Sequence, residues 1–307
     1  MEVSSRDTPI RVGPAGWSYK DWEGIVYPKP KPRGFDPLGF LALYFDALEV
    51  NSTFYRSQPA KVARAWADRV SHNRDFRFTA KLHRRFTHER KSAWTRDEVK
   101  EARETFDTLR DRGVLGAVLL QFPWSFKREP VSEEWLRDLL KAFPALPLVV
   151  EVRHASWNTP EFFAELESRG AGFVNVDQPM FRRSIAPSAR STSHVGYVRV
   201  HGRNYKDWFR KDAGRDARYD YLYSPEQLEP WADRARQLAE DPGTQEVYVV
   251  TNNHFRGQAV TNGLQLEAML RGEPVAAPAS LVEEFPEALL PYVSSRPLQE
   301  DSAHAPA

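Results

Sequence analysis

The sequence predicts a single α/β domain with the (β/α)8 barrel architecture of the TIM type. Eight runs rich in β-branched and aromatic residues recur along the chain, and segments with helical character separate most of them. The runs span 10–17, 47–55, 76–82, 115–123, 147–153, 171–179, 195–203 and 246–253. Their starts lie about 34 residues apart, the length that a strand–helix unit needs. Eight units in roughly 260 residues match the usual size of this barrel, whereas an open doubly wound sheet is the alternative.

The segments between the runs carry helix boundaries. Thr95 and Glu98 have the spacing of a capping box, ahead of a helix that we expect to end at Gly113. Thr159 precedes Pro160, which suits the first position of another helix.

Two further helices are expected, and one is expected to be incomplete. Ser224 and Gln227 form a second capping box, and Pro230 in the second turn is expected to bend that helix. Ser132 is expected to begin another helix. The segment 180–194, after the sixth strand, shows no helical period, so this unit is expected to lack a full helix.

We expect three regions along the chain. Residues 1–8 form a flexible N-terminus, and residues 9–272 form the barrel. Residues 273–307 form an Ala/Pro-rich tail, in which "LVEEFPEALLPYV" is expected to be one packing helix.

Composition excludes several classes of protein. The 307 residues include 43 Lys and Arg and 42 Asp and Glu, so no global field attracts nucleic acid or an acidic surface. The chain has no cysteine, which excludes disulfides, thiolate ligands and a cysteine nucleophile. The N-terminus lacks the apolar segment of a signal peptide, and no apolar run approaches the roughly 20 residues that span a bilayer. We expect a cytoplasmic protein with no membrane partner, and the oligomeric state stays open.

The strand ends carry the chemistry that the sequence offers. In "PLVVEVRHASW" (147–157) an apolar run ends in Glu151 and Arg153, two positions apart and therefore on one face of a strand. The active site of such a barrel lies at the C-terminal ends of its strands. Because the other runs turn polar at the same end, we expect a polar pocket at the mouth of the barrel. The structural alternative is a set of interior ion pairs that serves only the fold.

This pocket predicts a metal-free enzyme for a small anionic substrate that bears phosphate or carboxylate. The candidate catalytic residues are Glu151 or Asp177 as the base, His201 as the acid, Lys81 as an electrostatic stabiliser or Schiff-base amine, and Glu49. The candidate substrate-binding residues are Arg153, Arg199 and Arg203, which would hold the anion, with Asn51, Tyr55, Gln121, Trp17, Tyr19, Trp157, Asn252, Asn253, Gly257 and His88.

Two aromatic loops, 16–28 and the long 203–224 after the seventh strand, are expected to frame the mouth. The second loop mixes basic and aromatic residues, as a nucleic-acid contact does, but its four aspartates favour a substrate lid or a solvated insertion. In the last loop, Gly257 precedes a helix whose N-terminus is a weak candidate for binding phosphate.

No cofactor is predicted. Glu49, Glu151, Asp177 and His201 are ligand types that a divalent metal accepts, but no His-x-Glu or His-x-x-x-His spacing occurs and basic side chains compete for the carboxylates. No Gly-x-Ser-x-Gly motif and no dinucleotide fingerprint is present. A metal-assisted, nuclease-like or nucleic-acid-binding barrel and a noncatalytic ligand-binding barrel are the alternatives.

Seven motifs resemble the YecE-like family (DUF72), a family of unknown function. They are "GWSYKDWEGIVYP", "EVNSTFYRSQP", "FTAKLHRRFTH", "LLQFPWSF", "VEVRHASW", "VRVHGRNY" and "NNHFRGQAVTNG", in this order between about Val12 and Leu270. The resemblance implies a TIM-type barrel and supplies no settled activity, substrate or mechanism. Besides the candidates above, it includes Trp22, Phe54 and Gly202 among the motif residues. "GPAGW" departs from the more usual Ser- or Thr-containing turn.

Overall fold

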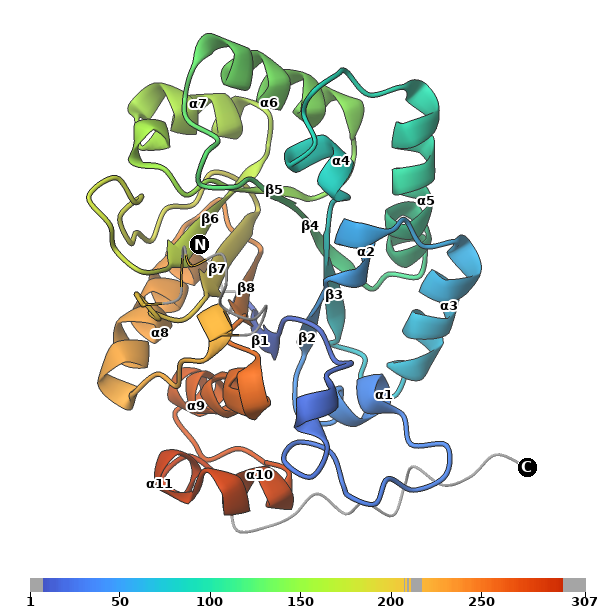
Figure 1. Ribbon diagram of the computed structural model, residues 1–307, viewed down its shortest axis with the longest axis vertical. Coiled ribbons are helices and arrows are strands. Elements are labelled where there is room, and N and C mark those ends of the chain that lie inside the picture. Colours follow the sequence, from blue (N-terminus) through green and yellow to red (C-terminus); the bar gives the residue numbers. More distant parts are fainter. Residues whose placement is uncertain (1–7, 207, 209, 211–216, 295–307) are drawn as a thin grey trace, which may run out of the picture.

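Eight parallel strands form a nearly closed barrel in the computed structural model, which describes residues 8–206, 208, 210 and 217–294 (Figure 1). The strands are β1 Ile10–Pro14, β2 Ala47–Val50, β3 Arg77–Lys81, β4 Leu115–Gln121, β5 Leu148–Glu151, β6 Gly172–Asp177, β7 Val195–Val200 and β8 Glu246–Thr251. Their order around the sheet is β1-β8-β7-β6-β5-β4-β3-β2. The predicted barrel is confirmed.

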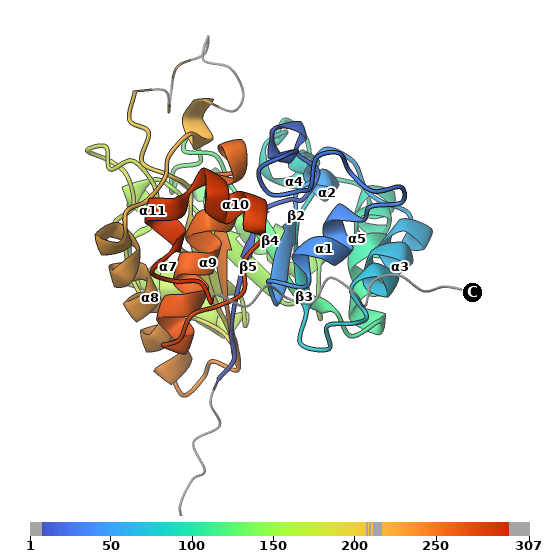
Figure 2. The ribbon, with the colours of Figure 1, turned by 90° about the horizontal axis from the view of Figure 1, so that it is seen from below.

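Helices surround the strands on the outside. They are α1 Pro37–Leu41, α2 Ser52–Tyr55, α3 Ala60–Arg69, α4 Arg84–Thr87, α5 Arg96–Asp111, α6 Pro130–Ala142, α7 Pro160–Ser168, α8 Pro225–Glu240, α9 Gln258–Arg271, α10 Ala279–Glu284 and α11 Pro286–Leu289. Short 3-10 turns occur at η1 Lys20–Trp22, η2 Ala155–Trp157, η3 Ala217–Tyr219 and η4 Phe255–Gly257. In Figure 2 the C-terminal ends of the strands lie at the upper side, with α2 and α4. The short helices therefore border the mouth.

The predicted starts of helices are confirmed where the sequence contains a capping residue. Thr95 and Glu98 form the capping box of α5, and Ser224 and Gln227 form that of α8. The Thr159 hydroxyl accepts a hydrogen bond from the amide of residue 162 at the start of α7. Pro230 lies inside α8, and residues 178–194 contain no helix, as the sequence predicts.

Two predicted helix boundaries are wrong. Helix α6 begins at Pro130, so Ser132 lies within it and does not cap it. The tail forms two short helices, α10 and α11, instead of one, and they lie beside α9 in both views (Figures 1 and 2). The break falls at Phe285, whose φ of −125° and ψ of 53° lie outside the helical region, because the following Pro286 disfavours helix at that position.

The strands are also shorter than predicted at their C-terminal ends. β2 ends at Val50, and the residues after Asn51 turn into α2, whereas a strand through residue 55 was expected. β5 ends at Glu151, so Arg153 follows the strand.

Parts of the predicted regions lie outside the described residues. These are residues 1–7 of the N-terminus, 295–307 of the tail, and 207, 209 and 211–216 of the loop after β7. In the portion of the chain that the structure describes, no helix combines the length and apolar character needed to cross a membrane.

The barrel closes where β1 approaches β2. Ala15 and Glu49 form a bridge, and the amide of Gly16 donates to the carbonyl of Glu49 at 2.8 Å. Gly13 makes this approach possible because a Cβ there would overlap the carbonyl oxygen of Ala47. Closure brings Glu49 to the inside of the barrel opposite β7.

Gly13→Ala is expected to lower the free energy of unfolding by about 3 kcal/mol or more, because the β2 backbone must move to admit the methyl group. Gly243→Ala is the matched control, since its new methyl group would meet only a side-chain oxygen of Asp241. Urea unfolding of both variants measures the difference. Equal losses would contradict this account of closure.

Candidate functional site at the barrel mouth

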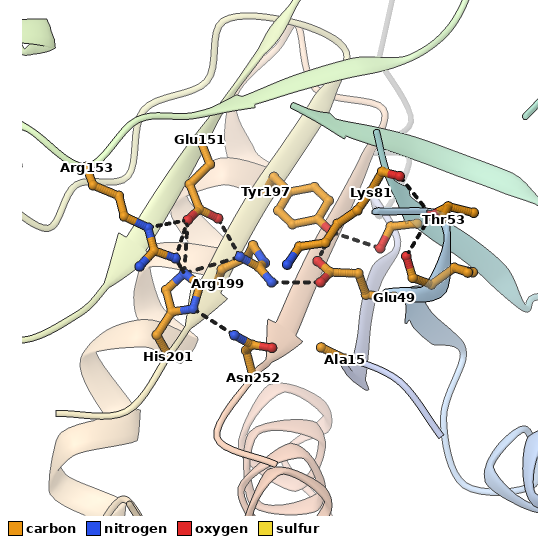
Figure 3. Close-up of polar contacts among 12 residues, drawn as sticks. Ala15, Glu49, Thr53, Lys81, Glu151, Arg153, Tyr197, Arg199, His201 and Asn252 are labelled. Atoms are coloured by element: carbon orange, nitrogen blue, oxygen red, sulfur yellow. Dashed lines mark hydrogen bonds and ion pairs between the residues drawn. The ribbon is translucent and has the colours of Figure 1, made fainter. Parts of the chain in front are cut away.

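Two glutamates and one arginine from three strands meet inside the barrel (Figure 3). Arg199 of β7 donates one terminal nitrogen to Glu49 of β2 at 2.7 Å and the other to Glu151 of β5 at 2.5 Å. All three side chains have no exposed surface. Inward-facing residues of different strands meet in layers in such a barrel, which explains why partners 48 and 150 residues apart in the sequence come together.

Arg153 and His201 extend this network toward the mouth. Arg153 donates to Glu151 through Nε at 2.8 Å, and the ring centre of Trp208 lies 5.6 Å from its guanidinium carbon. His201 Nε2 lies 3.2 Å from Glu151, and Nδ1 lies 3.0 Å from the amide nitrogen of Asn252. These partners fit a neutral imidazole whose Nε2–H donates to Glu151 and whose Nδ1 accepts from Asn252.

The charges of this network balance. Glu49 and Glu151 supply two negative charges, and Arg153 and Arg199 supply two positive charges. Burial would raise the pKa of Glu151, but the guanidinium groups of Arg199 and Arg153 hold it well below its usual range. Burial and the charge of Arg153 lower the pKa of His201 to about 3, so its imidazole is neutral at physiological pH. The interior thus holds four ions without a net charge.

Tyr197 and Thr79 complete the polar contacts below Arg199. The Tyr197 hydroxyl lies 2.8 Å from Thr79 Oγ1 and 3.2 Å from the second carboxylate oxygen of Glu49. Burial and the Glu49 charge raise the pKa of Tyr197 well above its usual value, which keeps it a neutral phenol. Both oxygens of Glu49 therefore have partners.

Lys81, at the end of β3, points its amine toward this balanced network without joining it (Figure 3). Its Nζ forms no hydrogen bond or ion pair with any residue that the structure describes, and lies 5.3 Å from the ring centre of Phe54. Burial and the positive charge of Arg199 lower the pKa of Lys81 to about 8, although Glu49 and Glu151 act in the opposite direction. An ammonium here adds a charge that no unpaired carboxylate balances.

A cavity of about 260 Å³ opens above Lys81 at the mouth of the barrel. It is lined by Tyr19, Asn51, Phe54, Tyr55, Lys81, Arg218, Tyr219, Asn252 and His254. Two of these groups are basic, two are amides, and none is a carboxylate. Asn252 links the cavity to the network beneath it through its contact with His201.

Helix α2 places three of the lining residues beside Lys81. The Thr53 hydroxyl donates to the carbonyl of Lys81 at 2.7 Å, which fixes the helix against the end of β3. The short helical turn then presents Asn51, Phe54 and Tyr55 to the cavity. The Oδ1 atom of Asn51 is buried and has no hydrogen-bond partner among the described residues. It is thus a buried acceptor without a partner among these residues, on a side chain that lines the cavity.

Three aromatic rings form the opposite wall. Tyr19 stacks on His254 with ring centres 4.4 Å apart, and Tyr219 packs against the same imidazole at 4.7 Å. The indole nitrogen of Trp22 donates to the His254 carbonyl at 2.7 Å and holds the loop after β8 in place. A substrate in the cavity would meet the flat faces of these rings and the cationic side chains of Lys81 and Arg218.

Three residues have surroundings that do not favour their expected roles. Arg199 cannot grip a substrate anion, because both terminal nitrogens are paired and the side chain is wholly buried. Glu151 is a weak base, since its carboxylate binds two guanidinium groups. His201 is neutral, so it carries no imidazolium proton to donate as the acid. The carboxylate of Glu49, also buried and paired, lies beneath the cavity.

Asp177 and Arg203 form a separate cluster. Arg203 Nε lies 2.9 Å from Asp177, and the hydroxyl of Tyr223 donates to the same carboxylate. Asp177 has 2% exposure and does not line the cavity. These contacts hold the loop after β7 and give Asp177 no position from which to act as the expected base. Of the three arginines, Arg203 has 31% and Arg153 has 14% of its side chain exposed, whereas Arg199 has none.

Several other candidates pack the fold instead of lining the cavity. Trp17 packs against Trp66 and Phe78, and the buried Trp157 donates to the carbonyl of Phe126. Neither side chain lines the cavity.

The remaining candidates support the loops and strand ends around the mouth. Asn253 donates to the carbonyl of Tyr221 at 2.8 Å. Gly257 has a φ of +80° at the start of α9, and Gln121 pairs with Glu151 in the register of β4 and β5. His88 packs edge-on against Phe54, and burial and the charge of Lys81 lower its pKa to about 4. None of the four lines the cavity.

The sequence-based candidates included Tyr19, Asn51, Tyr55, Lys81 and Asn252 among the lining residues and missed four. The missed residues are Phe54, Arg218, Tyr219 and His254. Phe54 and His254 lie in motifs that resemble those of the family. Each is adjacent in the sequence to a candidate residue, and this adjacency is the signal that could have identified it. Tyr219 and Arg218 occur in the long loop after β7, where no spacing distinguishes them.

Among the described residues, no three side chains of His, Asp or Glu converge as metal ligands would. The carboxylates that suggested this alternative are instead bound by arginines, Glu49 and Glu151 by Arg199 and Asp177 by Arg203.

The family comparison accords with this arrangement of motif residues. The family model described as "Protein of unknown function DUF72" matches residues 11–286. The chain belongs to the DUF72 family. The resemblance indicated by the seven motifs is thereby confirmed.

Relatives and solved structures agree with this assignment. YunF of Bacillus subtilis (strain 168), a UPF0759 protein, is 28% identical over 274 residues, which cover 85% of this chain and 94% of the relative. YecE of Escherichia coli O157:H7 is 25% identical over 203 residues, 66% of each chain. A DUF72 family protein of Thermotoga maritima has a crystal structure with a TM-score of 0.73 and 32% identity, covering 86% of this chain and 99% of that one. These names carry no activity or substrate.

Arg199→Met is expected to lower the free energy of unfolding by about 3–5 kcal/mol, because it leaves two buried carboxylates without their shared cation. Arg169→Met is the control, since it removes only an exposed ion pair with Glu165 and is expected to cost about 1 kcal/mol or less. Chemical denaturation measures both. A loss at Arg199 no larger than that at Arg169 would show that the network contributes nothing to the fold.

His201→Asn is expected to flatten the dependence of stability on pH. Below about pH 6.5 the unfolded chain protonates this histidine, whereas the folded one, with a pKa of about 3, stays neutral. The free energy of unfolding therefore falls with decreasing pH by up to roughly 1.4 kcal/mol per pH unit for this group. Unfolding curves between pH 4 and pH 6 should show a slope smaller by about one proton in the variant. Identical slopes would contradict the buried neutral state.

Proposed function

We propose that the chain is an enzyme that acts on a small anionic compound in the mouth cavity, with Lys81 as the reacting group. The observation that carries this proposal is the lining of the cavity, in which the described residues combine the amine of Lys81 with Arg218 and two amides and include no carboxylate. Such a lining attracts a carboxylate or phosphate group.

The state of Lys81 favours an enzyme over a passive binding site. A site that only binds an anion gains most from a fully charged cation. An amine with a pKa of about 8 is roughly one-quarter neutral at pH 7.5, and can therefore accept a proton or attack an electrophile. Perturbed amines in cavities are typical of catalytic sites.

The size of the cavity limits the substrate. Its volume of about 260 Å³ lies below the range of roughly 300–1,000 Å³ that is typical of drug-sized ligands. We therefore infer a compound no larger than a small phosphorylated metabolite or organic acid. The aromatic wall of Tyr19, His254 and Tyr219 provides apolar contact for its carbon skeleton.

Binding of small anions tests the first half of the proposal. A thermal-shift screen of inorganic phosphate, phosphorylated metabolites and organic acids is expected to find stabilising anions, since a ligand at 100 times its dissociation constant adds about 2.7 kcal/mol. Arg218→Ala is expected to weaken the binding of a hit about tenfold or more by removing one charge-assisted contact. Arg64→Ala, at an exposed position of α3, is the matched control. Hits that bind equally to wild type and to Arg218→Ala would contradict the cavity as the site.

Turnover tests the second half. Each hit is incubated with the protein in D₂O and followed by ¹H and ³¹P NMR for conversion or for exchange of carbon-bound hydrogen. Change is expected for at least one hit, and it should be lost in Lys81→Met while the thermal stability of that variant is retained. Anions that bind in the cavity and never react would make the protein a noncatalytic ligand-binding barrel.

A further inference from the structure

The amine of Lys81 has a position that suits covalent chemistry. It projects from the end of β3 into the cavity, its backbone is held by Thr53, and its Nζ lies 5.3 Å from the ring centre of Phe54. The nearest carboxylates, Glu49 and Glu151, are both bound by guanidinium groups. The backbone of Lys81 is thus held in place, whereas its Nζ has no hydrogen bond or ion pair with any described residue.

The other cations around the mouth cannot share this role. A guanidinium stays protonated in proteins and is a poor nucleophile, so Arg153, Arg199 and Arg218 serve as fixed charges. A lysine that is desolvated next to other cationic groups is the arrangement that activates an amine toward carbonyl carbon. The lowered pKa of Lys81 agrees with this geometry.

We propose that the substrate of this site is a small anion that carries an aldehyde or ketone group, and that this carbonyl condenses with Lys81 Nζ to form a Schiff base. This inference rests on the proposed function, since it names the substrate class for the same cavity. In this proposal, different residues bind the charged group and the carbonyl group of the substrate. Arg218 holds the charged group, and Lys81 binds the carbonyl carbon.

The reaction balances without a co-reactant. The neutral amine attacks the carbonyl carbon, a C–N bond forms, and the carbonyl oxygen takes up a proton to give a carbinolamine. The nitrogen gives up one proton, which replaces the proton that the oxygen took up. The hydroxyl then takes one proton from solvent, the C–O bond breaks and water leaves, so that a protonated C=N bond remains at Lys81 Nζ. The side chains of Asn51 and Asn252 both line the cavity in which the carbinolamine would form.

A Schiff base gives a function to a lysine at a site where its positive charge is unfavourable. The protonated imine withdraws electrons from the adjacent carbon and makes its C–H or C–C bond easier to break. The positive charge of the imine nitrogen next to this carbon therefore forms only after the substrate has bound. Before binding, the balanced network below favours the neutral amine.

Borohydride trapping tests the inference with the full-length protein. Glyoxylate, pyruvate and glyceraldehyde 3-phosphate are the carbonyl anions, and each is incubated with wild-type protein and sodium cyanoborohydride. Peptide mapping by mass spectrometry then locates the reduced adduct. We expect the Lys81 peptide to be labelled at least tenfold faster than the exposed Lys20 and Lys61 by at least one probe, and excess inorganic phosphate to slow that labelling.

The wild-type map decides the question even if a variant fails to fold. Where Lys81→Met folds, the fast adduct should disappear while surface labelling is unchanged. Labelling of Lys81 that is no faster than that of Lys20 and Lys61 with all three probes would overturn the inference.

A neutral probe, propionaldehyde, separates this inference from the proposed function. Fast labelling of Lys81 by propionaldehyde and glyoxylate alike, unaffected by phosphate, would support the Schiff base and overturn the anionic substrate. Phosphate binding that depends on Arg218, without labelling of Lys81 by any carbonyl probe, would leave the anionic function standing and overturn the Schiff base.

Discussion

The structure of the barrel mouth depends on one electrostatic constraint, the pairing of two carboxylates with two guanidinium groups inside the barrel. Glu49 and Glu151 share Arg199, and Arg153 completes the set from the mouth side. Each ion alone would be costly to bury, and removal of any one leaves its partners uncompensated. The arrangement also ties β2, β5 and β7 together across the barrel. It is thus a structural element of the fold, and it sets the electrostatic environment of the cavity above it.

The consequence for chemistry falls on Lys81. Because the ions beneath it cancel, its own positive charge is the unbalanced one, and the amine is partly neutral near physiological pH. The residues that looked most catalytic, Glu151 and His201, instead maintain this environment as a bound carboxylate and a neutral imidazole. The names of the DUF72 relatives give no activity. The proposed function therefore rests on the contrast between the paired ions inside the barrel and the amine of Lys81, which has no such pairing among the described residues.

Much of this could be predicted from the sequence, and the parts that could not have physical reasons. The period of strand–helix units predicted the barrel, and the spacing of Glu151 and Arg153 predicted a shared inward face. Nothing local in the sequence shows that Arg199 is saturated by Glu49, because that contact joins residues 150 positions apart. The segment that forms α2 is predicted as strand, because "NSTFY" is rich in residues that favour strands. This prediction does not place Phe54 at the cavity. His254 and Tyr219 meet only through tertiary packing.

The central claim is that Lys81 is the partly neutral amine of the cavity, and a direct titration tests it. Protein labelled with ¹³C and ¹⁵N in its lysines gives one side-chain NMR signal per lysine, and the signal missing in Lys81→Arg identifies Lys81. Its chemical shift is expected to titrate with a midpoint at about pH 8, well below the value near 10.4 of a lysine side chain in a model peptide. A Lys81 signal that titrates together with the exposed lysines would contradict the account.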